Sequence, residues 1–497
     1  MPVKGFPGYL FVFLVLILPL KGFSNFDFNT NCQKAYKSIF ELRLNAARQL
    51  IASEKEVHPE NSIVPLLENY VDYFYLITTE NKADFDKFKE RKSERLDRIE
   101  DDKDRNSPYY LYAQAEVNLQ WALLRGKYGE YFTAAREIKR ANSLLNDNSK
   151  KFPGFHLNLK GLGLINAFLG NLPDGLLKST LSTFGIKGNL QTGIAMLDKL
   201  AESLPKSTFE PFYEEVVFYY AYVLIDIAHS PSAYSKTMKF TARIEDTSLL
   251  KSYLQAYVCA KSGHNDEAIS ILSQRPSGGT YQAFPYLDLL MGTAKLNKLD
   301  YSAGTYFNRF LALNKGVNYI KDANLHLAWV ALLKGDTGAY SAFLAKVKNS
   351  GYTYIEKDKQ ALNEAAAPGP MIELLKARLL FDGGYFAKAS EVLSTLKTDN
   401  MVAKNKTEFY YRRGRVNDEL GKDEDALSDY QEAINNGKNL KYYFAANAAL
   451  QMGKIYEKNK NVSKAKASYN TAIAMKDHEY ESSIESQAKA GLKRLNK

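Results

Sequence analysis

Residues 410–434 read YYRRGRVNDELGKDEDALSDYQEAI and contain small and aromatic residues at regular intervals. Gly414, Gly421, Ala426, Tyr430 and Ala433 stand at relative positions 8, 15, 20, 24 and 27 of one unit. Small residues at positions 8 and 20 let the two helices of a hairpin approach closely. The aromatic residue at position 24 fills the gap to the neighbouring hairpin. The stretch therefore predicts a helical hairpin within an array of similar hairpins.

Further copies of this spacing surround it. Residues 445–473 repeat it with Gly453, Ala465, Tyr469 and Ala472, and weaker copies lie in residues 371–393 and 253–272. Residues 292–307 and 328–344 fit with one position missing or substituted. The spacing resembles that of tetratricopeptide repeats. We predict an all-α fold in which residues 241–497 form a tetratricopeptide-like solenoid of helical hairpins, with a capping helix at Glu481–Leu495.

Residues 25–240 have helical periodicity without a repeat of fixed length, and we predict an N-terminal all-helical domain there. Within it, residues 171–197 read NLPDGLLKSTLSTFGIKGNLQTGIAML, with a proline and four glycines. A phosphate loop would need a Lys-Ser/Thr pair after the glycines, and none is present. Helix breaks explain the pattern better: Gly170 ends one helix, Pro173 opens the next, and residues 185–189 separate it from a third.

The same region carries a second resemblance. A helix that contains several glycines is followed by Leu172-Pro173, a leucine-rich helix, a turn at Phe184-Gly185, Gly188-Asn189, and Gly193 with Leu197. Over residues 108–200 this order resembles the inclusion-body-clearance family, which includes the tetratricopeptide-repeat-39 proteins. The resemblance implies a largely helical interaction protein without enzymatic activity.

The first 24 residues have the pattern of a secretory signal peptide. Lys4 precedes an apolar run from Tyr9 to Leu20, and small residues follow at Gly22 and Ser24. The run is shorter than the roughly 20 residues that a membrane-spanning helix needs. We therefore predict an exported protein, periplasmic or extracellular, with no transmembrane span.

Charge and reactive residues exclude several function classes. The chain has a net charge of +10, and residues 441–497 contain 11 Lys and Arg against 5 Asp and Glu. These lysines are spaced along the sequence, which is typical of a solvated helical face, and export argues against a nucleic-acid partner. The six histidines have no metal-ligand spacing. We predict no enzymatic activity, no metal and no cofactor, and we leave open whether Cys32 and Cys259 pair.

The repeat alignment also predicts a binding surface. Position 9 of the first helix faces the concave groove of such an array, and position 5 lies one turn away. We predict that the groove binds an acidic, extended segment of another exported protein, in which arginine pairs with carboxylates. The alternatives are a convex, solvated face in a shifted register, and a glycan- or small-ligand-binding protein of an extracytoplasmic uptake system. The predicted partner-binding residues are Tyr257, Arg378, Arg415 and Lys454 at position 9, and Tyr253 and Tyr411 at position 5.

Overall fold

A computed structural model describes residues 25–172, 176–183 and 185–496. In this part of the chain the regular elements are all helical, and no strand is present. This confirms the all-α helical repeat fold that the sequence predicts. The predicted signal peptide, residues 1–24, lies outside the described residues.

The N-terminal region consists of helices that pack largely on their neighbours in sequence, such as α1 on α2 and α5 on α6. Ser107 caps α5 by accepting a hydrogen bond from the Tyr109 amide, and Pro108 occupies the first turn, as the cap rules favour. The helices are α1 (Thr30–Phe40), α2 (Leu44–Val57), α3 (Ile63–Thr79), α4 (Lys82–Glu100), α5 (Pro108–Lys127), α6 (Tyr131–Lys151), α7 (Asn158–Gly170), α8 (Leu176–Thr183), α9 (Leu190–Ser203), α10 (Tyr213–Tyr222) and α11 (Ala233–Thr241).

The glycines near residue 180 mark helix ends and a close helix contact. Helix α7 ends at Gly170 and α9 begins at Leu190, which confirms the predicted breaks. A Cβ on Gly193 would lie 2.5 Å from the carbonyl oxygen of Gly163, so α7 and α9 pack backbone to backbone at this point. Pro173 lies outside the described residues.

Six helical hairpins follow, and α25 packs on the last of them. Helix α25 has the bounds that the sequence predicts for a capping helix. The helices are α12 (Leu249–Lys261), α13 (Asn265–Gln274), α14 (Tyr286–Asn297), α15 (Ala303–Leu313), α16 (Ile320–Leu333), α17 (Thr337–Asn349), α18 (Glu356–Ala366), α19 (Ile372–Asp382), α20 (Phe386–Ser394), α21 (Ala403–Glu419), α22 (Asp423–Gly437), α23 (Phe444–Lys458), α24 (Val462–Ala474) and α25 (Glu481–Leu495). Helix α18 is an additional helix between the third and fourth hairpins.

A glycine in the first helix of three hairpins faces an aromatic ring of the second. A Cβ on Gly453 would lie 2.5 Å from the Tyr469 ring, and one on Gly414 would lie 2.7 Å from the Tyr430 ring. Gly292 has the same relation to Phe307, at 2.8 Å. The three rings are 0% exposed. The positions that the sequence singled out are therefore positions of close helix contact.

The hairpins do not form a simple linear stack. The turn between α12 and α13 touches the turn between α19 and α20, because a Cβ on Gly384 would overlap the backbone of Gly263. Both glycines have a positive φ, 76° and 78°, which a side chain would disfavour. The Tyr385 hydroxyl donates to Asp266 at 2.8 Å across the same contact.

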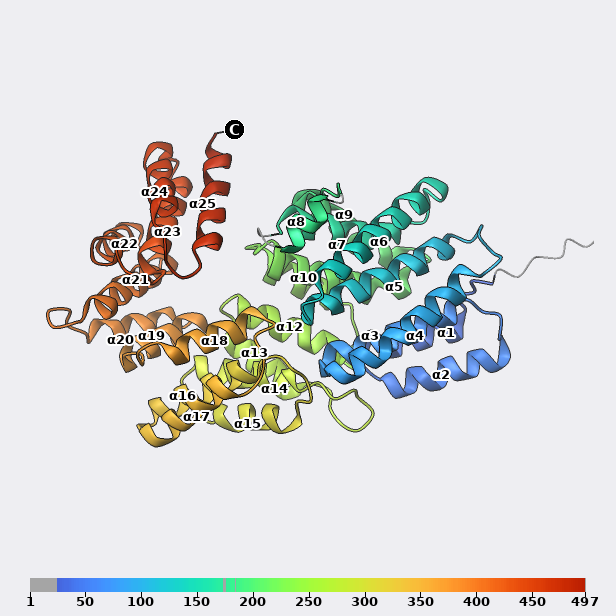
Figure 1. The fold of residues 1–497 in the computed structure, drawn as a ribbon, viewed down its shortest axis with the longest axis horizontal. Coiled ribbons are helices and arrows are strands. Elements are labelled where there is room, and N and C mark those ends of the chain that lie inside the picture. The colour runs from blue at the N-terminus through green and yellow to red at the C-terminus, as the bar shows by residue number, and fades with distance from the viewer. Residues whose placement is uncertain (1–24, 173–175, 184, 497) are drawn as a thin grey trace, which may run out of the picture.

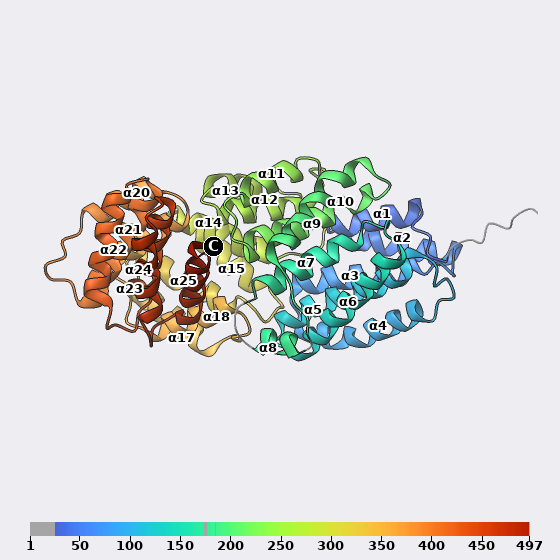
Figure 2. The same ribbon diagram turned by 90° about the horizontal axis from the view of Figure 1, so that it is seen from above.

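The helices follow an open arc, from the blue N-terminal helices through α14–α17 to the red hairpins (Figure 1). Seen from above, the C-terminal hairpins lie at the opposite end of the molecule from α1 and α2 (Figure 2). One cluster of buried apolar side chains extends from Phe26 to Met291 and so crosses the predicted domain boundary at residue 240. The division into domains 25–240 and 241–497 stays a prediction.

Replacing Gly453 with leucine should destabilise the protein by about 1–3 kcal/mol or more, because overpacking a close contact forces the Tyr469 ring and the helices apart. Urea denaturation measures this free energy of unfolding. Gly279→Leu is the matched control, since a Cβ there meets nothing within 4 Å. Equal stability of the two variants would contradict the role assigned to Gly453.

Candidate functional site

An apolar cavity of about 470 Å³ lies between the N-terminal helices and the first hairpins. One wall comes from α3, α5, α6, α7, α10 and the π-helical turn η3 (Val223–Ile227), and the other from α12, α14, α15 and residues 314–319. Its volume falls in the range of roughly 300–1,000 Å³ that small-molecule sites have. Many of the lining side chains are aromatic, among them Phe74, Phe218, Tyr222, Tyr253, Tyr257 and Tyr286.

Two of the predicted binding residues, Tyr253 and Tyr257, line this cavity. They stand one turn apart on α12, with ring centroids 5.6 Å apart, and Tyr253 also contacts the Phe284 ring at 5.2 Å. Ala256 and Cys259 of the same helix are fully buried. The tyrosine face of α12 therefore contributes to the wall of the cavity.

Asp226 is a carboxylate in the wall of the cavity. The π-helical turn η3 carries it, and the Tyr257 hydroxyl donates a hydrogen bond to its Oδ1 at 2.7 Å. Burial raises the pKa of this carboxyl group, while the Tyr257 hydrogen bond and the charges of Lys261 and His229 oppose that change. Within the described residues Asp226 forms no ion pair.

The other charged groups of the wall neutralise each other. Glu80, at the C-terminal end of α3, pairs with Lys127 of α5. Asn318 donates a second hydrogen bond to Glu80 at 2.8 Å. The Lys127 side chain is 33% exposed, so this edge of the cavity reaches the molecular surface.

A buried ionic network lies behind the cavity wall. Lys160 of α7 is 0% exposed, and its ammonium group pairs with Glu116 of α5 at 2.8 Å and with Glu215 of α10. The Tyr70 hydroxyl donates to Glu215 at 2.8 Å, and the Tyr36 hydroxyl donates to the same carboxylate. The network joins five helices, α1, α3, α5, α7 and α10, through one buried cation.

The sequence analysis missed this network. Lys160, Glu116 and Glu215 are far apart in sequence and carry no recognisable spacing. One signal was present: Lys160 and Glu215 stand in the apolar segments NLKGLGLINAFLG and YEEVVFYYAY. Ionisable residues are rarely fully buried unless they are paired, so each of these segments indicates a partner elsewhere.

The remaining predicted residues lie on α19, α21 and α23. Each is the first helix of its hairpin, and α21 contacts both α19 and α23. Arg378 forms two parallel hydrogen bonds with Glu364, each 3.0 Å long, and its guanidinium lies 4.9 Å from the centroid of the Trp329 ring. Glu364 belongs to the additional helix α18, so the repeat spacing could not reveal the pair. Arg378 is therefore already neutralised by the protein.

Tyr411 belongs to the core, although its position, one turn from the groove residue, predicted that it would give a partner apolar contact area. It is 5% exposed, and its ring packs against the rings of Tyr443 and Phe444 at 5.6 and 5.5 Å. Its burial follows from the close spacing of α21 and α23. Tyr411 therefore offers little area to a partner.

Arg415 and Lys454 form a pair of cations with few anionic partners. The Arg415 guanidinium lies 4.8 Å from the centroid of the Phe381 ring, donates to the Tyr411 hydroxyl at 3.4 Å and is 3.9 Å from Glu419. The Lys454 ammonium donates to Gln487 at 3.3 Å. It has no ion pair within the described residues.

The pKa of Lys454 reports the charge around it. Desolvation by surrounding side chains lowers this pKa, and the positive charges of Arg415 and Arg494 lower it further, while Asp418 opposes them. The Lys454 residue as a whole is nevertheless exposed to solvent. Arg415 and Lys454 therefore form a region of positive potential that an anion would stabilise.

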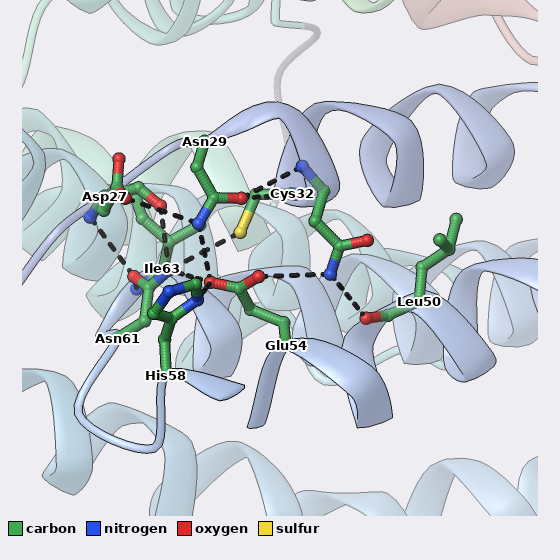
Figure 3. Close-up of polar contacts among 9 residues, drawn as sticks. Asp27, Asn29, Cys32, Leu50, Glu54, His58, Asn61 and Ile63 are labelled. Atoms are coloured by element: carbon green, nitrogen blue, oxygen red, sulfur yellow. Dashed lines mark hydrogen bonds and ion pairs between the residues drawn. The ribbon is translucent and has the colours of Figure 1, made fainter. Parts of the chain in front are cut away.

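A polar cluster near the first described residues is structural (Figure 3). Glu54 accepts hydrogen bonds from Asn29 at 2.7 Å, Asn31 at 3.1 Å and Asn61 at 2.8 Å, and contacts His58 at 3.1 Å. Burial alone would raise the pKa of Glu54, but these hydrogen bonds outweigh it and the pKa is lowered. The cluster ties the chain before α1 to α2 and to the start of α3.

Candidate metal ligands and the two cysteines lie within residues 25–172, 176–183 and 185–496. No group of three or more His, Cys, Asp or Glu is placed there to hold a metal ion. Cys32 and Cys259 are both free and buried, and burial raises the pKa of each thiol to about 12. A disulfide between them is not formed.

Comparison with known proteins bears on the last hairpin, α23 and α24. The tetratricopeptide repeat family model matches residues 446–478, which cover most of α23 and all of α24. This segment of the chain is therefore similar to a tetratricopeptide repeat, and repeats of this class suit protein–protein interaction. No curated protein matches the chain. In the described residues no helix is long and apolar enough to cross a membrane.

Three solved structures are among those to which the chain is similar. The P58(IPK) TPR domain is 14% identical; the match covers 83% of this chain and 97% of that chain, with a TM-score of 0.21. The APC/C hetero-tetramer Cut9-Hcn1 is 11% identical; the match covers 94% of this chain and 97% of that chain, with a TM-score of 0.26. Yeast Tom70 is 11% identical; the match covers 94% of this chain and 95% of that chain, with a TM-score of 0.24.

Replacing Lys160 with methionine should destabilise the protein by about 3–5 kcal/mol, because the Glu116 and Glu215 carboxylates lose their shared cation. Burial already raises the pKa of Glu116 to about 6, so the folded state holds its proton more tightly than the unfolded chain. Protonation of Glu116 therefore contributes to the stability of the folded state. This contribution is complete below the ordinary pKa of 4.5 and is lost as the pH rises through about 6.

The loss in Lys160→Met should consequently be larger at about pH 8 than at about pH 5, as chemical denaturation at the two pH values would show. Lys199→Met, at an exposed position on α9, is the control and should change stability by less than about 0.5 kcal/mol. A pH-independent loss would contradict the ionic role of Lys160.

Proposed function

We propose that the protein is an exported scaffold that binds an extended, acidic segment of another protein on the surface of its C-terminal hairpins that carries Arg415 and Lys454. The observation that carries this proposal is the cation pair Arg415 and Lys454 on the neighbouring helices α21 and α23. The tetratricopeptide class of these hairpins supports a protein partner.

The physical argument is charge complementarity. Two neighbouring cations raise each other's free energy, and a carboxylate from a partner would lower it by pairing with both. A guanidinium group can bind a carboxylate with two parallel hydrogen bonds. The Phe381 ring beside Arg415 would hold that guanidinium plane in place during binding.

Export, and a relationship to the inclusion-body-clearance family, are further parts of the proposal. The support for export is the signal pattern in residues 1–24. The support for the relationship is the motif order in residues 108–200, whose helix ends at Gly170 and Leu190 lie where that order places them.

If residues 1–24 are a cleaved signal peptide, the protein purified from its native host should begin near Asn25. Intact-mass measurement tests this directly. A mass that includes residues 1–24, in protein recovered from a membrane fraction, would show a retained anchor in place of a signal peptide.

A glutamate-rich labelled peptide should bind the protein, and the same peptide with every Glu replaced by Gln should not. Arg415→Gln with Lys454→Gln should weaken binding at least tenfold, because each lost charge-assisted hydrogen bond is worth about 1.5–3 kcal/mol. Fluorescence anisotropy at two salt concentrations measures the affinity and its screening.

The matched control is Lys422→Gln with Lys438→Gln, which removes the same charge from exposed positions at the ends of α22. It should leave binding unchanged. If the control weakens binding as much as the Arg415 and Lys454 changes do, the attraction comes from the net charge of the chain and the proposed surface is wrong.

A further inference from the structure

We infer that the aromatic cavity is a second binding site, which takes a small amphipathic amine whose ammonium group pairs with Asp226. Its apolar body would lie among the tyrosine and phenylalanine rings of the wall. This inference goes beyond the proposed function and does not rest on it, because none of its residues belongs to the Arg415–Lys454 surface.

The charges of the wall favour a cation. Glu80 and Lys127 pair with each other, which leaves Asp226 as the charged group of the lining that has no ion-pair partner among the described residues. Lys261 and His229 affect Asp226 from outside the cavity, since neither contributes to its wall. The Lys261 ammonium lies 5.4 Å from the centroid of the Tyr257 ring and forms no ion pair in the described residues.

The aromatic side chains favour the same ligand. The faces of tyrosine and phenylalanine rings attract cations, most strongly where water is excluded. A carboxylate ligand would meet the like charge of Asp226, and the only lysine in the wall, Lys127, is already paired. A neutral ligand would remove water from Asp226 without supplying a charge in return.

The local backbone also sets this position apart. Residues Val223–Ile227 form a π-helical turn, closed by the Ala228 amide donating to the Val223 carbonyl at 2.8 Å. Such turns are rare and occur frequently at functional sites. Here the turn follows α10 directly, and both Tyr222 and Asp226 contribute to the cavity wall.

Octylamine, octanol and octanoate test the inference, because they share a hydrocarbon chain and differ in the charge of the head group. Isothermal titration calorimetry of the full chain should show octylamine binding at least tenfold more tightly than octanol, and octanoate more weakly than octanol. Equal binding of octylamine and octanol, or no binding of octylamine, would overturn the inference.

Asp226→Asn keeps an oxygen that can accept the Tyr257 hydrogen bond but removes the charge. It should abolish the preference for octylamine while the octanol affinity stays unchanged. Asp425→Asn, at an exposed position on α22, should keep the preference. An amine preference that survives in Asp226→Asn would overturn the assignment of the ammonium partner.

Leu123→Trp places a large side chain in the cavity wall and should weaken all three probes. Thermal melting of each variant without a probe checks that it is folded. Unchanged affinities in folded Leu123→Trp protein would place the binding outside the cavity and overturn the inference. The comparison of probes with the unmodified chain decides the ligand class even if one variant does not fold.

Discussion

The repeat array depends on the contact between a glycine of one helix and an aromatic ring of the next. At Gly453 the missing Cβ lets the Tyr469 ring lie against the first helix of its hairpin. The same ring faces Gly491 of α25, where a Cβ would also lie 2.5 Å away. One ring therefore sets both the spacing within the hairpin and the position of the following helix.

The hairpins were predictable because their spacing is local. Gly414 and Tyr430 lie within one hairpin, so a single sequence contains the whole pattern. Helix α18 follows no repeat, and its Glu364 neutralises Arg378, so the charge of that groove position could not be read from the alignment. The burial of Tyr411 could not be predicted for a similar reason: the rings of Phe444 and Tyr443, from the next hairpin and the residue before it, cover its side chain.

The cavity could not be predicted, although two of its tyrosines were chosen from the sequence. Its wall draws on residues from Tyr73 to Ile355, and only the folded chain brings these together. The buried network bears on its shape as well. The Lys160 ammonium lies 5.8 Å from the centroid of the Tyr219 ring, and that ring is part of the wall. A buried ionic cluster thus supports one side of the cavity.

The contact between Gly263 and Gly384 changes how the array would respond to force. In a linear solenoid each repeat touches only its neighbours, so the array can extend elastically by small tilts at every interface. Here the turn of the first hairpin contacts the turn of the fourth, so the second and third hairpins lie between two segments that are in direct contact. Tension along the chain would load this contact first, whereas the hairpins beyond α20 would remain free to extend.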